Sequence, residues 1–281
     1  MPENFRPPLV FAQDRYFWNA LPCNPSSFMT TPSELARLID HALLHPTLTD
    51  AELREGCALA AHYGVASVCI KPYAVMAAAG WLEGTRVRVG TVIGFPHGSH
   101  TTAGKVAETE NACAEGATEI DVVVNVGKVL GGDWDYVSRE ITALRAATRQ
   151  FGATLKVIFE NDYLPADDPK IRLCEICSAA AVDFVKTSTG FGFVRGADGR
   201  YGTAGATEHD LKLMRRHAAP TVGVKASGGI RTLDDLLRAR SWGVTRIGTS
   251  ATAALLEEAR QRFGGAPVGE SPAAGRDVPG Y

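Results

Sequence analysis

The stretch AVDFVKTSTG, residues 181–190, decides how the rest of the chain is interpreted. It begins as an apolar, β-prone run and ends in small hydroxylic residues and glycine, which predicts a buried strand that ends in a loop. Because side chains alternate along a strand, Phe184, Lys186 and Ser188 share one face. Two interpretations of Lys186 are open. It is either a strand-end lysine that reaches water or pairs with a carboxylate, or a lysine kept there to lose its proton and attack a carbonyl group.

A second stretch, TVGVKASGG at residues 221–229, repeats this design. It is a short β-prone run with Lys225 near its end and a glycine pair behind it. If the two strands are parallel neighbours, their backbones lie roughly 4.8 Å apart, and both lysines end on the same side of one sheet. A like charge that close lowers a lysine pKa. The pair therefore favours the second interpretation, in which one lysine is a free amine suited to Schiff-base chemistry.

Outward from these stretches, the chain alternates strand-like and helix-like segments. The other predicted strands are residues 38–44, 65–70, 87–93, 119–125, 155–160 and 244–248. The predicted helices are residues 50–63, a segment from 72, and 103–115, 134–151, 170–180, 208–217, 233–242 and 251–262. Eight strands, each followed by a helix, predict an α/β fold of the (β/α)8 TIM-barrel type. A doubly wound open sheet is the alternative, weakened because no GxGxxG follows the first strand.

We expect three parts in the chain. Residues 1–31 are rich in Pro, Asn and aromatic residues and form an N-terminal arm, which either covers the barrel or a partner subunit or is mobile. Residues 32–263 form the barrel. Residues 264–281 are dominated by Gly, Ala and Pro and form a flexible tail that ends in Tyr281.

Composition excludes several classes of function. The 281 residues are 45% hydrophobic and carry a net charge of −2, so nothing indicates nucleic-acid binding. No apolar run is long enough to span a membrane, and residues 1–20 lack the apolar block of a signal peptide, so we expect a cytoplasmic protein. Neither the CxxC at residues 174–177 nor the pair His97 and His100 has companions at ligand spacing. We therefore expect no metal and no cofactor.

The last two strands of the barrel end in loops suited to phosphate. In such barrels the active site lies at the C-terminal ends of the strands, and phosphate commonly binds the loops after strands seven and eight. Here those loops carry Gly228 and Gly229, and then Gly248, Thr249 and Ser250. They offer backbone N–H groups without large side chains, and the second leads into a helix N-terminus. Ordinary turn glycines are the alternative.

These motifs together resemble the deoxyribose-phosphate aldolases, which are class I, Schiff-base aldolases on a (β/α)8 barrel. The matching stretches are IDH 39–41, VCI 68–70, VIGFP 92–96, EIDVV 119–123, LKVI 155–158, FVKTSTG 184–190, VKASGGIR 224–231 and RIGTS 246–250. The resemblance implies reversible cleavage of 2-deoxyribose 5-phosphate into glyceraldehyde 3-phosphate and acetaldehyde. It implies that Lys186 forms the Schiff base, that Lys225 perturbs it, and that Asp121 acts in proton relay.

Other site residues follow from the strands and the matching stretches. Asp121 on the inner face of a barrel needs a partner, and Lys156 on the next strand is the natural one. A carboxylate held between Lys156 and Lys225 can position a water or shuttle protons; a purely structural ion pair is the alternative. Cys69 is expected to form part of the pocket wall, because no histidine base is obvious beside it. Asp40 and Thr189 are expected to bind the phosphosugar. The assembly is expected to be a dimer or tetramer of identical chains.

Two departures from the family pattern affect the prediction. Ala42 and His45 stand where the family often has Thr and Lys, which alters contacts of the first strand. The segment FVRGADGRY, residues 193–201, is inserted directly after the Schiff-base strand, where Arg195 or Arg200 either binds phosphate or narrows the aldehyde range. Two other functions therefore stay open: a barrel aldolase for a different aldehyde, and a non-catalytic phosphosugar-binding barrel.

Tyr281 is the last candidate. An extended tail of this length reaches farther than a barrel's radius, so the phenol can visit the mouth and protonate an enamine carbon. The alternative is a disordered end whose tyrosine has no role.

Overall fold

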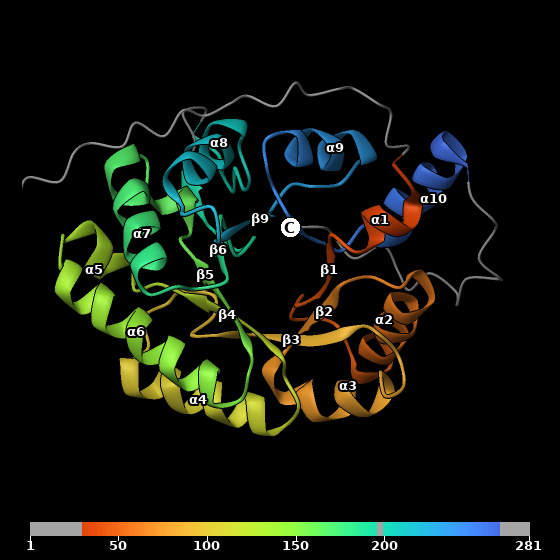
Figure 1. Cartoon of the computed structure of the whole chain (residues 1–281), viewed down its shortest axis with the longest axis horizontal. Helices are drawn as coiled ribbons and strands as arrows, with labels where there is room; N and C mark the ends of the chain where they lie inside the picture. Colours follow the sequence, from red (N-terminus) through yellow and green to blue (C-terminus); the bar gives the residue numbers. More distant parts are fainter. Residues whose placement is uncertain (1–29, 196–198, 265–281) are drawn as a thin grey trace, which may run out of the picture.

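The chain folds as a closed barrel of eight parallel strands surrounded by helices (Figure 1). The computed structural model describes residues 30–195 and 199–264. The barrel strands are β1 (Ile39–Leu43), β2 (Ser67–Ile70), β3 (Arg88–Ile93), β4 (Glu119–Val123), β5 (Thr154–Ile158), β6 (Phe184–Lys186), β9 (Gly223–Ser227) and β10 (Arg246–Thr249). Their order around the barrel is β1-β10-β9-β6-β5-β4-β3-β2. The predicted (β/α)8 fold is confirmed.

The helices follow the strands as predicted. They are α2 (Asp50–Tyr63), α3 (Val75–Trp81), α4 (Thr102–Ala114), α6 (Trp134–Gln150), α7 (Asp167–Ala179), α8 (Glu208–His217), α9 (Leu233–Ser241) and α10 (Thr252–Phe263), with short 3-10 turns η1 (Pro72–Ala74) and η2 (Asn161–Tyr163). Thr49, Thr207 and Thr232 cap α2, α8 and α9 through their side chains, as the sequence indicated. Each cap accepts a bond from a backbone N–H that the helix leaves unpaired.

Two short helices were not predicted. Helix α1 (Pro32–Ala36) begins at Thr31, which forms a capping box with Glu34. Helix α5 (Val126–Leu130) begins where the prediction continued the strand, because the Asn125 side chain accepts from the N–H of Lys128. Strand β4 therefore ends at Val123 rather than at residue 125.

The central strand is shorter than predicted. The backbone of Ala181 adopts a left-handed conformation (φ 51°) after α7, and the ladder of β6 begins only at Phe184. The three residues of β6 nevertheless include Lys186 at its C-terminal end. Lys186 therefore lies at the C-terminal end of its strand, as predicted.

The inserted segment after β6 includes a small hairpin, which the sequence did not predict. Strands β7 (Val194–Arg195) and β8 (Tyr201–Gly202) pair antiparallel, and the rings of Phe193 and Tyr201 stack at 4.6 Å. Asp162 on η2 anchors the returning chain by accepting bonds from Thr203 Oγ1 and from the next backbone N–H groups. The hairpin thus follows the end of β6, and the chain then returns toward α8.

The interior of the barrel differs from the layer outside it. Apolar side chains fill the space between strands and helices, whereas charged side chains occupy the barrel interior. The predicted arm and tail, including Tyr281, lie almost wholly outside the described residues. Within those residues, no helix combines the length and apolar character needed to cross a membrane.

Candidate active site

Strand register brings the two lysines together. Lys186 on β6 is the direct neighbour of Lys225 on β9, and Asp121 on β4 is the direct neighbour of Lys156 on β5. Neighbours in a parallel ladder point to the same face, so all four side chains enter the barrel. The expectation that the two lysine strands are parallel neighbours is confirmed.

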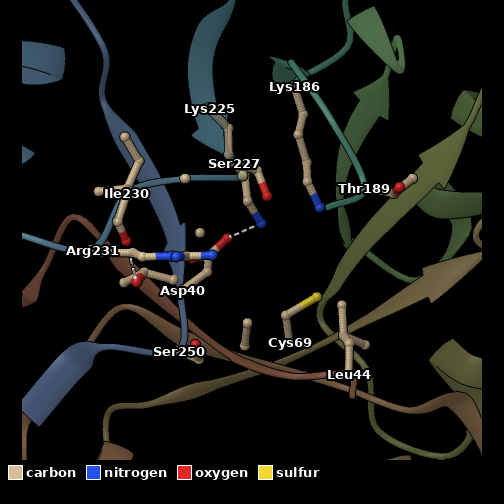
Figure 2. A pocket seen from close by; sticks show the side chains of 15 residues that line it. Asp40, Leu44, Cys69, Lys186, Thr189, Lys225, Ser227, Ile230, Arg231 and Ser250 are labelled. Atoms are coloured by element: carbon tan, nitrogen blue, oxygen red, sulfur yellow. Dashed lines mark hydrogen bonds and ion pairs between the residues drawn. The ribbon is translucent and has the colours of Figure 1, made fainter. Parts of the chain in front are cut away.

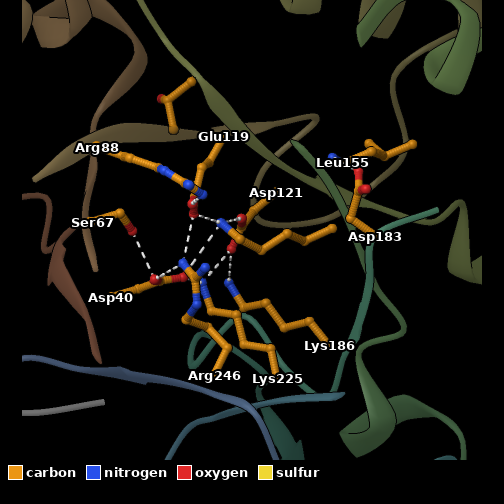
Figure 3. Close-up of polar contacts among 12 residues, drawn as sticks. Asp40, Ser67, Arg88, Glu119, Asp121, Leu155, Asp183, Lys186, Lys225 and Arg246 are labelled. Atoms are coloured by element: carbon orange, nitrogen blue, oxygen red, sulfur yellow. Dashed lines mark hydrogen bonds and ion pairs between the residues drawn. The ribbon is translucent and has the colours of Figure 1, made fainter. Parts of the chain in front are cut away.

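Asp121 is the centre of this group (Figure 3). Lys156 Nζ donates to its Oδ1 at 2.7 Å, while Lys186 Nζ and Lys225 Nζ both donate to its Oδ2, at 2.9 and 2.7 Å. Burial would raise the pKa of Asp121, but the three ammonium groups hold it well below its usual range. The predicted partnership of Asp121 with Lys156 and Lys225 is present, and it extends to Lys186.

The two central lysines differ in their protonation. Burial lowers the pKa of Lys186 and the charge of Lys225 lowers it further, whereas Asp121 opposes both. Burial also acts against the charge of Lys225, but Asp121 and Asp40 outweigh it and raise the pKa of Lys225. Lys225 therefore keeps its proton more firmly than Lys186, which fits the roles expected from the sequence.

Two further charged residues of the barrel interior, Arg246 and Glu119, were not predicted from the sequence. Arg246 on β10 donates to Asp40 Oδ1 at 2.5 Å and to Glu119 Oε2 at 2.8 Å. Asp40, predicted only to bind substrate, also accepts from Lys225 Nζ at 2.5 Å. Alternation was the available signal, because Glu119 shares a strand face with Asp121.

Gly248 has a second role beside the predicted one. A Cβ at Gly248 would lie 3.2 Å from Cε of Lys225 and 3.0 Å from Oγ of Ser227. The missing side chain thus makes room for the lysine to reach Asp121 across the barrel. We infer that packing, in addition to any ligand, requires glycine here.

A pocket opens at the C-terminal ends of the strands (Figure 2). It holds about 490 Å³ of empty space including its open mouth. It is lined by Asp40, Ala42, Leu44, Cys69, Lys186, Thr189, Lys225, Ser227, Gly228, Gly229, Ile230, Arg231, Gly248, Thr249 and Ser250. Every predicted substrate-binding residue is in this set, whereas Asp121 and Lys156 lie outside it.

Arg231 is the one charged pocket residue, among those described, that was not predicted as a site residue. It follows the Gly228-Gly229 turn and stands on the same side of the pocket as Ser250 (Figure 2). The motif around it was recognised, but an arginine at a loop position gives no sequence signal of its direction. Arg195, one of the two arginines expected either to bind phosphate or to narrow the aldehyde range, donates to the carbonyl of Gly199 in the hairpin and does not line the pocket.

Thr189 and Cys69 form the wall near Lys186. The Thr189 hydroxyl bonds to Glu160 and accepts from the N–H of Phe191, and the N–H of Thr189 donates to Glu160. Thr189 is thereby fixed in position at the pocket surface. Burial raises the pKa of the Cys69 thiol, so Cys69 is a neutral wall residue and not a nucleophile.

A possible cation site lies elsewhere. Asp167, His209 and Asp210 come close enough to share an ion. The ammonium group of Lys170 already contacts Asp210 at 2.5 Å and Asp167 at 3.3 Å. The lysine therefore takes the place that a metal would occupy.

A buried lysine pair at the mouth of such a barrel is typical of class I aldolases, and similarity to known proteins agrees with this class. Residues 35–251 match the model of the DeoC/LacD family aldolase. The chain belongs to this family.

Deoxyribose-phosphate aldolases from several organisms are similar to most of this chain. A deoxyribose-phosphate aldolase from Rhodopirellula baltica is 52% identical over 231 residues, which is 82% of this chain and 91% of that protein. One from Caldanaerobacter subterraneus is 45% identical over 225 residues, 80% of this chain and 93% of that protein. The structure of deoxyribose phosphate aldolase from Aeropyrum pernix, described as tetrameric, has a TM-score of 0.72 at 32% identity and covers 81% of this chain and 92% of its own.

Proposed function

We propose that this enzyme reversibly cleaves 2-deoxy-D-ribose 5-phosphate to D-glyceraldehyde 3-phosphate and acetaldehyde through a Schiff base on Lys186. One observation carries the proposal. Lys186 lines the pocket and shares the carboxylate of Asp121 with Lys225, its direct neighbour in the ladder. This is the arrangement that lowers the pKa of one amine and leaves it able to attack a carbonyl carbon.

The charged group supplies the proton transfers that such chemistry needs. The Lys186 amine adds to the aldehyde carbon of the open-chain sugar, and the carbinolamine loses water to give an iminium. Deprotonation of the 3-hydroxyl breaks the C2–C3 bond, releases glyceraldehyde 3-phosphate and leaves an enamine. Protonation of the enamine carbon and hydrolysis return acetaldehyde and free Lys186. Asp121 accepts hydrogen bonds from both Lys225 and Lys186. Asp121 and Lys225 hold and return protons in these steps.

The glycine-rich side of the pocket suits the phosphate. Gly228, Gly229 and Ser250 line it, and the loop with Ser250 leads into α10. Backbone N–H groups and a helix N-terminus favour an anion, and Arg231 adds a positive charge on this side. The sugar then extends from the phosphate loops toward Lys186.

The experiment that tests this function combines product analysis with trapping. Purified enzyme is incubated with 2-deoxyribose 5-phosphate, and both products are quantified. In parallel, acetaldehyde and borohydride are added and the protein mass is measured. We expect both products and a stable adduct of one ethyl group. An adduct without these products would point to an aldolase for another aldehyde, and the absence of any adduct would point to a phosphosugar-binding protein.

We further propose that the active protein is a homo-oligomer, a dimer or tetramer, and that it works in the cytoplasm. The tetramer described for the Aeropyrum pernix relative supports the first of these. No nucleic acid, membrane, metal or cofactor is part of the proposed reaction.

A further inference from the structure

The charges buried inside the barrel do not balance. The ion-paired carboxylates are Asp40, Glu119 and Asp121, and their basic partners are Lys156, Lys186, Lys225 and Arg246. None of these side chains is more than 9% exposed. With every group ionised, three negative charges face four positive ones. Because an uncompensated buried charge is unfavourable, the folded protein gains if one base releases its proton.

The contacts indicate which base releases it. Lys156 contacts three carboxylates, those of Asp40, Glu119 and Asp121, at 3.4, 2.7 and 2.7 Å. Among the described residues, Lys225 contacts two carboxylates, and Lys186 contacts only that of Asp121, at 2.9 Å. The guanidinium of Arg246 does not deprotonate in proteins. The positive charge of Lys186 is therefore the one least compensated by carboxylates, and Lys186 is the base that releases its proton.

Arg246 lies at the far end of this group from the pocket. It is the first residue of β10, and Glu119 is the first residue of β4, so both lie at the N-terminal ends of their strands. Figure 3 shows Arg246 joined to Asp40 and Glu119, with Asp121 between them and Lys186. The Arg246 guanidinium also lies over the ring of Phe184, 5.1 Å from its centre. Arg246 cannot touch a substrate in the pocket.

We propose that Arg246 is a positioning residue for the reaction: its fixed charge engages Asp40 and Glu119 and so leaves Lys186 as the base that holds no proton. The inference rests on the proposed function, because it concerns the amine that forms the Schiff base. Arg246, at the N-terminal end of β10, thus controls the protonation of Lys186 at the C-terminal end of β6.

The other charged groups around these residues do not supply the missing negative charge. Glu160, beside Lys186 on the β5 side, binds Thr189 and forms no ion pair within residues 30–195 and 199–264; burial raises its pKa. Cys69 on the β2 side is a neutral thiol, since burial raises its pKa. Arg88 on β3 contacts Glu119 at 3.2 Å, but 58% of its side chain is exposed, so water screens its charge.

The test compares four variants by the rate at which Lys186 acquires a reduced acetaldehyde adduct as pH is raised. The adduct is trapped with cyanoborohydride and quantified on the Lys186 peptide. Arg246→Met leaves three acids and three bases, so Lys186 keeps its proton and the midpoint rises by on the order of one pH unit. Glu119→Gln leaves two acids and four bases, so the midpoint falls by on the order of the same amount.

The double variant and a matched control complete the design. Glu119→Gln with Arg246→Met leaves two acids and three bases, which restores the single surplus charge, and the midpoint returns to the wild-type value. Arg88→Gln removes the exposed arginine from the same carboxylate and leaves the midpoint in place. Both single variants also lose stability, because each removes buried ion pairs and leaves the remaining partners with fewer contacts. A merely structural role lowers stability in both but does not move the midpoint in opposite directions.

The outcomes are distinguishable. Opposite shifts that cancel in the double variant support the inference. Shifts of one sign, no shift, or a double variant that keeps the shift of either single variant overturn it while the proposed function stands. If Arg246→Met does not fold, the downward shift in Glu119→Gln and its reversal in the double variant decide the question. If wild-type protein forms no adduct on Lys186 at any pH, the proposed function falls and this inference with it.

Discussion

Lys105 in the ring of helices and Lys186 inside the barrel are both buried lysines, with exposed fractions of 0% and 2%. Burial lowers the pKa of each. Lys105 on α4 donates to Glu140 at 2.7 Å and to the carbonyl of Val123 at 2.8 Å, and Glu140 forms no other ion pair within the described residues. Lys186 shares Asp121 with Lys156 and Lys225.

The comparison separates burial from reactivity. Both lysines are desolvated, but only Lys186 lines a pocket, and only Lys186 competes with other ammonium groups for its carboxylate. A lysine with a carboxylate of its own is a structural ion pair. A lysine that shares one, and faces a cavity, is a candidate nucleophile. Substitutions at these lysines and at the pocket loops test this distinction.

Lys186→Arg should abolish turnover, by at least about a thousandfold, because a guanidinium stays protonated and does not form a Schiff base. Steady-state kinetics with 2-deoxyribose 5-phosphate measures the effect. The matched control is Lys105→Met, which should lower the free energy of unfolding by about 3 kcal/mol, because Glu140 is left buried without its partner. That variant should still form the acetaldehyde adduct. Loss of the adduct in folded Lys105→Met protein would remove the distinction between the two lysines.

Lys225→Leu should move the rise of the pH–rate profile to higher pH, by on the order of one unit. The sign follows from the charges. Without the Lys225 ammonium, Lys186 keeps Asp121 more to itself, its pKa rises, and the free amine appears only at higher pH. Lys225→Arg keeps the charge and should keep the midpoint, although the rate falls. An unchanged midpoint in Lys225→Leu would mean that the two amines are not coupled.

Ser250→Asp and Gly229→Asp should raise KM for the phosphorylated sugar by about tenfold or more, because a carboxylate repels the phosphate at these loops. Ser250→Asn, which is uncharged and of similar shape, is the control and should have a much smaller effect. Trapping of acetaldehyde on Lys186 should be unaffected in all of them, which separates pocket access from amine chemistry. Equal losses with the unphosphorylated sugar would exclude phosphate recognition at these loops.

The smallest effect is expected at Tyr281, which lies outside the described residues. Tyr281→Phe and deletion of residues 276–281 should both slow exchange of the acetaldehyde methyl hydrogens with deuterated water, because the phenol would protonate the enamine carbon. Trapping at Lys186 should remain intact. Wild-type exchange rates in both variants would leave the tail without a catalytic role.

Much of the fold could be predicted because its signals are local. Short apolar, β-prone runs indicated the eight strands, and hydroxylic caps indicated several helix starts. The misses are also local. Asn125 ended β4 early by capping α5, and Ala181 delayed β6. The hairpin pairing of Val194 with Gly202 was missed because the segment between them has no strong strand pattern.

The site was predicted as far as strand order allows. Lys186, Lys225 and Asp121 could be placed together because parallel neighbours end at one edge of a sheet. Arg246 and Glu119 were missed because they lie at the other end of their strands, where a charged residue usually faces water. Both side chains are buried inside the closed barrel, and the balance of acidic and basic groups there can be read only from the structure.

The central claim is that Lys186, which lines the pocket and contacts only the shared carboxylate of Asp121 among the described residues, is the nucleophile. The most direct measurement is peptide mapping of wild-type protein after reduction with borohydride in the presence of acetaldehyde. The account predicts a single ethyl adduct on Lys186 and none on Lys105, Lys156 or Lys225. An adduct on Lys225 in place of Lys186 would reverse the assignment, and labelling of Lys105 to the same extent would contradict the account.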